Sequence, residues 1–306
     1  MSRIPARRLG IDLGGTKIEV AVLDAEGGFL FRERCSTPQG DYAGTIEAIA
    51  GLVATAEQAV GPVDSIGIGT PGTRSPQTGL MKNANSVVLN QRPLQRDLEA
   101  RLGRGLVMAN DANCLALSEA HGGAAAGART VFGVILGTGV GGALVVDGQV
   151  LAGAHGIAGE WGHNPLPWPS PAELAVPPCW CGKTGCLETW LSGPGFAADF
   201  RRGGGAPMPA VAIIEAATAG DAQAQAALDR YIDRLARGLA TVINLFDPEV
   251  IVLGGGLSNV AALYAAVPAR WQDWVFSDPI QTRLVPPRFG DSSGVRGAAF
   301  LPEFGQ

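Results

Sequence analysis

Three cysteines and one histidine in the middle of the chain have the types and the spacing of a metal site. Cys179, Cys181 and Cys186 form a Cys-x-Cys-x4-Cys pattern with glycines between the last two, and His163 precedes them. Three thiolates and one imidazole are a set that tetrahedral Zn2+ takes in closed, structural sites. Because protein fills all four positions, the ion would shape a loop and would not activate water. The alternative is a group of unpaired core thiols or a disulfide.

Two carboxylates flank this predicted zinc site. Glu160 lies three residues before His163, and Glu188 lies two residues after Cys186. Metal binding would fix where both side chains point, as it does for other groups that surround metal ligands. Carboxylates in fixed positions suit a ligand with several hydroxyl groups, because each carboxylate accepts hydrogen bonds from them. We expect both glutamates to hold a substrate.

Two glycine-rich bends between predicted strands offer backbone N–H groups and a threonine hydroxyl to a phosphate. The first hairpin, over residues 9–23, bends at Gly14, Gly15 and Thr16, and the second, over 133–146, bends at Gly137, Thr138 and Gly139. The repeat predicts a duplicated domain. Each bend, taken alone, could also be an ordinary turn without a ligand.

One difference between the two copies concerns an acidic residue. Asp12 stands in the first hairpin where the second has Ile135. A carboxylate beside bound phosphates could orient Mg2+, which proteins usually hold with one or two carboxylates and the phosphates of the substrate. The alternative is a solvated aspartate at the end of a strand.

Further polar or glycine-rich residues follow predicted strands. An apolar strand from Val107 ends in Asn110 and Asp111, and Asn85 lies in a polar loop. Active-site acids often lie at such strand ends, although Asp111 could equally be a helix N-cap. Asn85 could donate to a ligand hydroxyl. Another strand, over 249–253, runs into Gly254, Gly255 and Gly256, which would either let a phosphate-bearing ligand approach the backbone or form a tight turn.

Composition excludes several classes of protein. The chain has 306 residues, of which 46% are hydrophobic and 17% charged, with a net charge of -5. This size suits two domains with a cleft between them, and the charge gives no general attraction to nucleic acid or to anionic membranes. The apolar run after the basic start is broken at Asp12, so it does not form a signal peptide. We therefore expect a cytoplasmic protein that neither spans a membrane nor binds nucleic acid.

The complete set of motifs resembles the ROK family of sugar kinases, across essentially the whole chain. The motifs are Asp12-Leu-Gly-Gly-Thr-Lys17, Ala109-Asn-Asp-Ala-Asn113, Leu136-Gly-Thr-Gly139, Gly159-Glu-Trp-Gly-His163, Cys179-x-Cys-Gly-x-x-Gly-Cys186-x-Glu188 and Gly254-Gly-Gly256. The resemblance implies an α/β protein of the actin-like ATPase (ribonuclease H-like) fold with duplicated domains. We expect a small domain over 1–112, completed by a C-terminal helix over 292–306, and a large domain over 113–291. The family also suggests a homodimer.

The resemblance implies a role for each motif. ATP phosphates would lie at the Gly14–Thr16 and Gly137–Gly139 bends, with Lys17 beside the first, and Gly254–Gly256 would lie under the adenosine. Asp111 would be the general base, helped by Mg2+ near Asp12. The residues that would bind the sugar are Asn85, Asn110, Asp111, Glu160, His163 and Glu188. His163 would use one ring nitrogen for the sugar and the other for zinc.

Two segments, Gly159–Trp168 and Asn110–Ser118, look most like bacterial fructokinases with mannokinase activity. We therefore expect ATP-dependent phosphorylation of D-fructose at its 6-hydroxyl, with mannose as a weaker substrate. The alternatives are an N-acetylglucosamine kinase or a glucokinase of the same family. A sugar-responsive regulator of the family would need a DNA-binding segment, and the sequence before Leu9 leaves no room for one.

Overall fold

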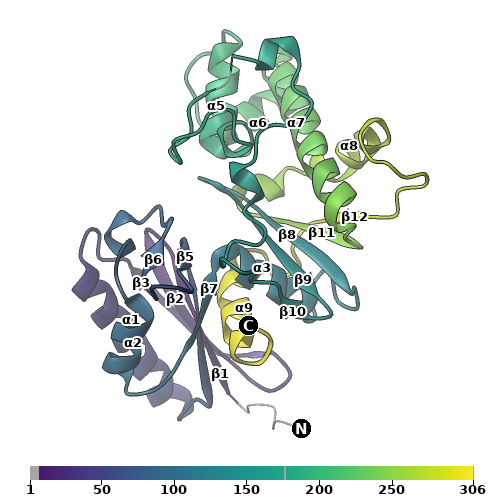
Figure 1. Cartoon of the computed structure of the whole chain (residues 1–306). Coiled ribbons are helices and arrows are strands. Elements are labelled where there is room, and N and C mark those ends of the chain that lie inside the picture. Colours follow the sequence, from purple (N-terminus) through teal and green to yellow (C-terminus); the bar gives the residue numbers. More distant parts are fainter. Residues whose placement is uncertain (1–6, 176, 306) are drawn as a thin grey trace. The chain divides into compact units, whose positions relative to one another are not determined.

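A computed structural model describes residues 7–175 and 177–305 (Figure 1). The chain forms two compact units, the first made of Met1–Gly127, Ala143–Ala158 and Arg288–Gln306, and the second of Ala128–Gly142 and Gly159–Pro287. The expected boundary after residue 112 therefore differs from the observed one. The reason is that α3 (Asp111–Ala120) packs against α9 (Ser293–Phe304), and both helices belong to the first unit.

The predicted C-terminal helix over 292–306 corresponds to α9, while residue 306 lies outside the described residues. This helix belongs to the first unit. The predicted cleft between the domains stays a prediction.

The first unit is built on a five-stranded sheet in the order β3-β2-β1-β4-β7. Its strands are β1 (Arg8–Leu13), β2 (Lys17–Leu23), β3 (Phe29–Ser36), β4 (Ser65–Thr70) and β7 (Val107–Asn110). The first three are antiparallel neighbours, whereas β4 runs parallel to both β1 and β7. Because β1, β4 and β7 are parallel, their carboxyl ends, with Asp12, Thr70 and Asn110, reach the same edge of the sheet.

Helices cover this sheet (Figure 1). The apolar sides of α1 (Tyr42–Val60) and α2 (Leu94–Leu102) form one core with β1, β2 and β4. Helix α9 lies directly against β1 and β4, where a Cβ atom on Gly10 or Gly67 would collide with its backbone. Two short strands, β5 (Thr73–Arg74) and β6 (Met81–Lys82), and the 3-10 turn η1 (Val87–Leu89) complete the unit's loops.

A second five-stranded sheet has the order β10-β9-β8-β11-β12. Its strands are β8 (Thr130–Leu136), β9 (Val140–Val146), β10 (Gln149–Val150), β11 (Val250–Gly254) and β12 (Arg283–Val285). Like the first sheet, it places a three-stranded antiparallel meander beside two strands that run parallel to its central strand. The matching strand orders confirm the duplication that the repeated hairpins predict.

Helices of the second unit surround the longest one, α7 (Ala222–Phe246). The others are α4 (Glu188–Leu191), α5 (Gly193–Arg202), α6 (Ala210–Thr218) and α8 (Leu263–Ala266), with 3-10 turns η2 (Trp161–His163), η3 (Pro171–Glu173), η4 (Gly256–Asn259) and η5 (Pro268–Asp273). A further 3-10 turn, η6 (Gly290–Ser292), precedes α9 in the first unit. Within the described part of the chain, no helix is both long and apolar enough to cross a membrane.

One face of α7 carries arginines into a buried charge network. Arg234 Nε donates to Glu173 Oε1 at 2.7 Å, and Arg237 Nη2 donates to both oxygens of the same carboxylate at 2.9 and 3.0 Å. Arg234 also pairs with Asp199 of α5 at 2.8 Å. Glu173, Arg234 and Arg237 are each at most 6% exposed. The network therefore ties the 3-10 turn η3 and helix α5 to α7 through charges that water does not screen.

The Glu173 carboxylate supplies a testable contribution to stability. Burial raises its pKa, but hydrogen bonds from Arg237, Arg234 and the Ser170 N–H outweigh burial and lower the pKa from 4.5 to about 2. We expect Glu173→Gln to cost about 3–5 kcal/mol at neutral pH, since it leaves two buried guanidinium groups without their carboxylate. Because the folded pKa is depressed, the contribution is complete above pH 4.5 and is lost as the pH falls toward 2.

Calorimetric unfolding of the parent and the variant over a pH series would measure this. A control is Glu47→Gln, which breaks an exposed pair with Arg101 and should change the unfolding temperature little. A Glu173→Gln protein as stable as the parent at neutral pH would show that the network contributes nothing.

Candidate functional site

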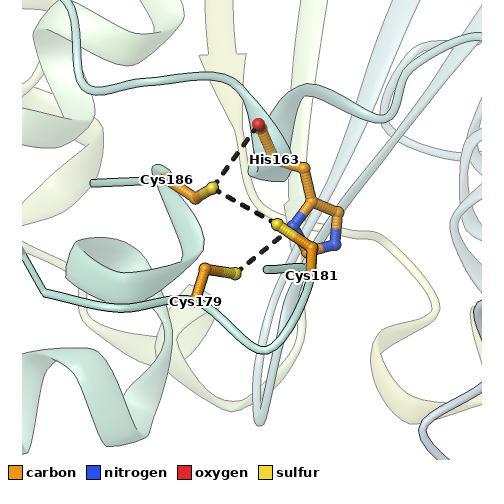
Figure 2. Close-up of side chains that lie close together, drawn as sticks. All are labelled: His163, Cys179, Cys181 and Cys186. Carbon is orange, nitrogen blue, oxygen red and sulfur yellow. Dashed lines mark hydrogen bonds between the residues drawn. The ribbon is translucent and has the colours of Figure 1, made fainter. Parts of the chain in front are cut away.

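The four predicted metal ligands lie together in the second unit. One ligand atom from each of His163, Cys179, Cys181 and Cys186 lies within 4.8 Å of the others. The sulfur atoms of Cys181 and Cys186 are 3.7 Å apart, and Cys179 Sγ is 3.6 Å from His163 Nδ1 (Figure 2). A tetrahedral site with zinc–sulfur bonds of about 2.3 Å and zinc–nitrogen bonds of about 2.0 Å has edges of about 3.8 and 3.5 Å. The donor set therefore fits one zinc ion.

Burial and backbone contacts change the pKa values of the three thiols. Burial raises the pKa of Cys179, and it raises the pKa of Cys186 to about 12. The backbone N–H of Lys183 lowers the pKa of the more accessible Cys181. Burial thus favours the protonated form of Cys179 and of Cys186. A divalent ion would reverse this, since a coordinated thiol loses its proton.

Backbone pairing holds the histidine segment and the cysteine loop against each other. Pro165 and Cys186 form an antiparallel bridge, and the Leu187 N–H donates to Asn164 O at 2.8 Å. The cysteine loop closes on itself through a second bridge, between Pro178 and Thr184. The two segments are therefore joined by hydrogen bonds as well as by the ligand cluster.

Glu160 and Glu188 lie at the ends of these joined segments. Glu160 precedes the 3-10 turn η2, whose Trp161 is buried and donates from Nε1 to Gly141 O at 2.9 Å. Glu188 is the first residue of α4, and its Oε2 accepts from the Val140 N–H at 3.0 Å. The roles of Glu160, His163 and Glu188 in binding a sugar stay predictions. Nδ1 of His163 faces the thiols, which leaves Nε2 for another partner.

A pocket of about 790 Å³ in the same unit contains part of the predicted nucleotide site. Gly137 and Thr138 line it from the bend between β8 and β9, and Gly256 lines it from the end of β11. Gly255 shapes this end: its φ is +79°, and a Cβ atom there would lie 2.5 Å from Leu136 O. Gly139, Gly254 and Gly255 are not among the residues that line the pocket.

The apolar wall of this pocket was not predicted from the sequence. It comes from α5, α6 and η4, and its residues include Pro194, Ala210, Val211, Ile214, Leu257 and Val260. Val211 is 61% exposed on α6, which also carries Glu215 at the pocket. The available sequence signal was the unbroken apolar run from Ala210 to Ile214, which is wider than one buried helix face. An apolar wall opposite glycine turns suits a flat base above a phosphate chain.

Two aspartates approach each other in the first unit. Burial, followed by the nearby charges of Asp111 and Glu19, raises the pKa of Asp12 from 3.8 to about 6. Lys17 acts in the opposite direction. A buried carboxylate with other acidic side chains nearby is a place where a divalent cation is favourable. The residues thus fit Mg2+, which Asp12 would help to hold.

Asp111 begins α3, directly after β7. Its Oδ1 accepts from the Ala112 N–H at 2.8 Å, whereas the N-cap is Asn110, whose side chain accepts from the Asn113 N–H at 2.7 Å. Asn110 therefore has the capping role that was the alternative for Asp111. Asp111 itself is exposed and lies at the carboxyl end of β7.

The first glycine bend lies close to the loop that carries Asn85. Gly15, Thr16 and Asn85 are exposed, and a Cβ atom on Gly15 would lie 3.3 Å from the Ser86 hydroxyl. Gly14 closes the bend by donating to Lys17 O at 2.9 Å. The Lys17 ammonium lies 3.9 Å from Glu19 Oε2. Glu19 is a buried acid beside the site that sequence reasoning missed, although its alternation with Lys17 along β2 was visible.

Comparison with known proteins places these motifs in a family. The model of the ROK family matches residues 8–303. The N-acetyl-D-glucosamine kinase of Photobacterium profundum is 40% identical over 296 residues, which are 95% of this chain and 98% of the relative.

Solved structures agree with this. The ROK hexokinase of Thermus thermophilus has a TM-score of 0.85 at 33% identity and covers 96% of both chains. A ROK glucokinase from Streptomyces griseus, in complex with glucose and AMPPNP, has a TM-score of 0.78 at 29% identity, over 96% of this chain and 98% of the other. The fold is therefore that of the actin-like sugar kinases. The chain belongs to the ROK family, as one of its ATP-dependent sugar kinases.

Proposed function

We propose that the protein phosphorylates N-acetyl-D-glucosamine at its 6-hydroxyl, with ATP as the phosphoryl donor. The observation that carries the choice of sugar is the 40% identity, over 95% of the chain, to a relative named N-acetyl-D-glucosamine kinase. The expected preference for fructose is not confirmed, since the comparisons favour the alternative of an N-acetylglucosamine kinase. Short segments that look like fructokinases carry less information than identity along the whole chain.

The proposed reaction is an in-line transfer of the terminal phosphoryl group. Asp111 accepts the proton of the attacking 6-hydroxyl, whose oxygen forms the new bond to phosphorus as the bond to ADP breaks. The bends at Thr16 and Thr138 hold the phosphates with backbone N–H groups. When Mg2+ is bound, it neutralises charge on the phosphates. The role of Lys17 beside Thr16 stays a prediction.

Sugar recognition in this proposal depends on fixed acceptors and on His163. Glu160 and Glu188 accept hydrogen bonds from sugar hydroxyls, Asn85 and Asn110 add amide groups, and His163 uses Nε2. A sugar that lacked one bonded hydroxyl would leave a carboxylate without its partner and would lose affinity. The ligand cluster would hold Zn2+ and keep these side chains in place. The homodimer that the family suggests stays a prediction.

The choice of sugar can be tested by coupled release of ADP. With saturating Mg-ATP, we expect the highest kcat/KM for N-acetylglucosamine, above those for glucose, mannose and fructose. The physical reason is that a site with room and partners for an acetamido group leaves those partners unpaired when a smaller sugar binds. A higher kcat/KM for fructose would restore the fructokinase interpretation, and release of ADP without any hexose would argue against a sugar kinase.

The role of Asp111 can be tested by Asp111→Asn, which keeps the shape and removes the proton acceptor. Turnover should fall by roughly 10^2 to 10^4, the usual contribution of a general base, with sugar affinity nearly unchanged. Steady-state kinetics and calorimetric sugar binding would measure the two effects. Glu33→Gln, on the exposed edge strand β3, is the control and should retain full turnover. Near-normal turnover of Asp111→Asn would place the base elsewhere.

The metal assignment predicts about one zinc per chain in the purified protein. Cys181→Ser should release the metal and weaken sugar binding more than ATP binding, because His163 and Glu188 lose their common anchor. Metal analysis and separate titrations with sugar and with a nucleotide would check this. The matched control is Cys35→Ser, on β3 outside the cluster. An active enzyme that contains no zinc would overturn the assignment.

A further inference from the structure

An exposed tryptophan lies between two of the predicted metal ligands. Trp180 follows Cys179 and precedes Cys181, and 63% of its surface is exposed. The backbone around it is fixed, since Cys179 N–H donates to Lys183 O at 2.8 Å and Gly182 N–H donates to Cys179 O at 3.0 Å. A large aromatic side chain on a rigid loop, with most of its surface in water, adds little to the core. Its position therefore calls for another explanation.

The Trp180 indole contacts two side chains of the proposed sugar site. Its Nε1 donates to Glu188 Oε1 at 2.5 Å. Its ring meets the His163 imidazole edge to face, with the ring centroids 5.0 Å apart and the planes at 86°. Hydrogen bonds to a carboxylate are among the stronger ones that a side chain makes. The indole thus links the metal-ligand loop to the carboxylate by a directional contact.

The Glu188 carboxylate is held from both sides. Oε2 accepts from the Val140 N–H at 3.0 Å, while Oε1 accepts from Trp180. The space around Oε2 is narrow, because a Cβ atom on Gly139 would lie 2.7 Å from it. A carboxylate offers about four lone-pair positions, so these two bonds leave others for hydroxyl groups. Glu188 is therefore oriented before a sugar arrives, which lowers the entropy cost of binding.

We propose that Trp180 is a positioning residue for sugar recognition: its indole N–H holds the Glu188 carboxylate in the orientation from which it binds the sugar. The inference rests on the proposed function of Glu188 as a sugar ligand. Trp180 acts through Glu188 and His163, and it couples the geometry of the metal-ligand loop to the affinity for the sugar.

The test is Trp180→Phe, which keeps an aromatic ring beside His163 and removes the N–H donor together with one of the two indole rings. We expect the KM for the sugar, and its Kd measured by calorimetry without nucleotide, to rise about 10-fold, as for the loss of a hydrogen bond to a charged group. The zinc content, the KM for ATP and kcat should stay within about twofold of the parent. The control is Trp168→Phe, because Trp168 is also exposed in this unit but stacks on Trp274.

A double-mutant cycle with Glu188→Ala, which removes the acceptor of the indole N–H, separates positioning from other effects. If Trp180 acts through Glu188, adding Trp180→Phe to Glu188→Ala should weaken sugar binding little further. Losses that simply multiply would overturn the proposal, as would an unchanged Kd for Trp180→Phe or a loss of zinc from it. The cycle uses the hexose with the highest kcat/KM in the parent enzyme. If the proposed substrate is wrong, the kcat/KM values of the parent enzyme will show it, and the Trp180 proposal can still be tested with the hexose that the parent prefers.

Discussion

The predicted sugar-binding side chains of the second unit depend on one constraint, the joining of the His163 segment to the cysteine loop. Backbone bridges and a cluster of one imidazole and three thiols hold these segments together, although 16 residues separate His163 from Cys179. Ordering a loop costs conformational entropy for each residue. Neither segment belongs to a long helix or strand whose hydrogen bonds could offset this loss. An ion bound to the cluster would offset it, because a preformed site rarely exists in an unfolded chain.

The two sheets supply the remaining groups by repetition. Each sheet places a meander beside parallel strands, so that each central hairpin ends in a glycine bend and each neighbouring parallel strand ends near it. Duplication thus produces two similar glycine bends, which are the predicted binding sites for the ATP phosphates. The copies differ at Asp12, which the second copy replaces with Ile135. Burial of Asp12 and the nearby charges of Asp111 and Glu19 raise the pKa of Asp12 to about 6.

Sugar identity illustrates the limit of short motifs. The segments over 159–168 and 110–118 suggested fructose, whereas the comparison along the whole chain favours N-acetylglucosamine. Hexoses differ from one another in a few groups, so one set of carboxylate and imidazole side chains is compatible with several of them. The choice between hexoses then depends on small differences in where the surrounding loops place the sugar-binding side chains. A motif of ten residues does not determine those positions.

The sequence by itself determined the fold class, the duplication and most of the candidate site, because these follow from local signals. Glycine bends after apolar strands, a helix from Tyr42 to Val60, and the spacing of three cysteines all act over short distances along the chain. The types and spacing of the residues are enough to predict these features, because glycine bends and helices depend on local backbone conformation and a metal site depends on the number of ligands.

Only the tertiary structure decided which distant residues meet. It assigned α3 to the first unit through its packing on α9, built the apolar wall of the pocket from α5 and α6, and buried Glu173 between Arg234 and Arg237. It also brought the Trp180 indole to Glu188. These contacts form when whole helices, strands and loops pack together and bring side chains that are far apart in the sequence next to each other. A local sequence pattern does not predict such packing.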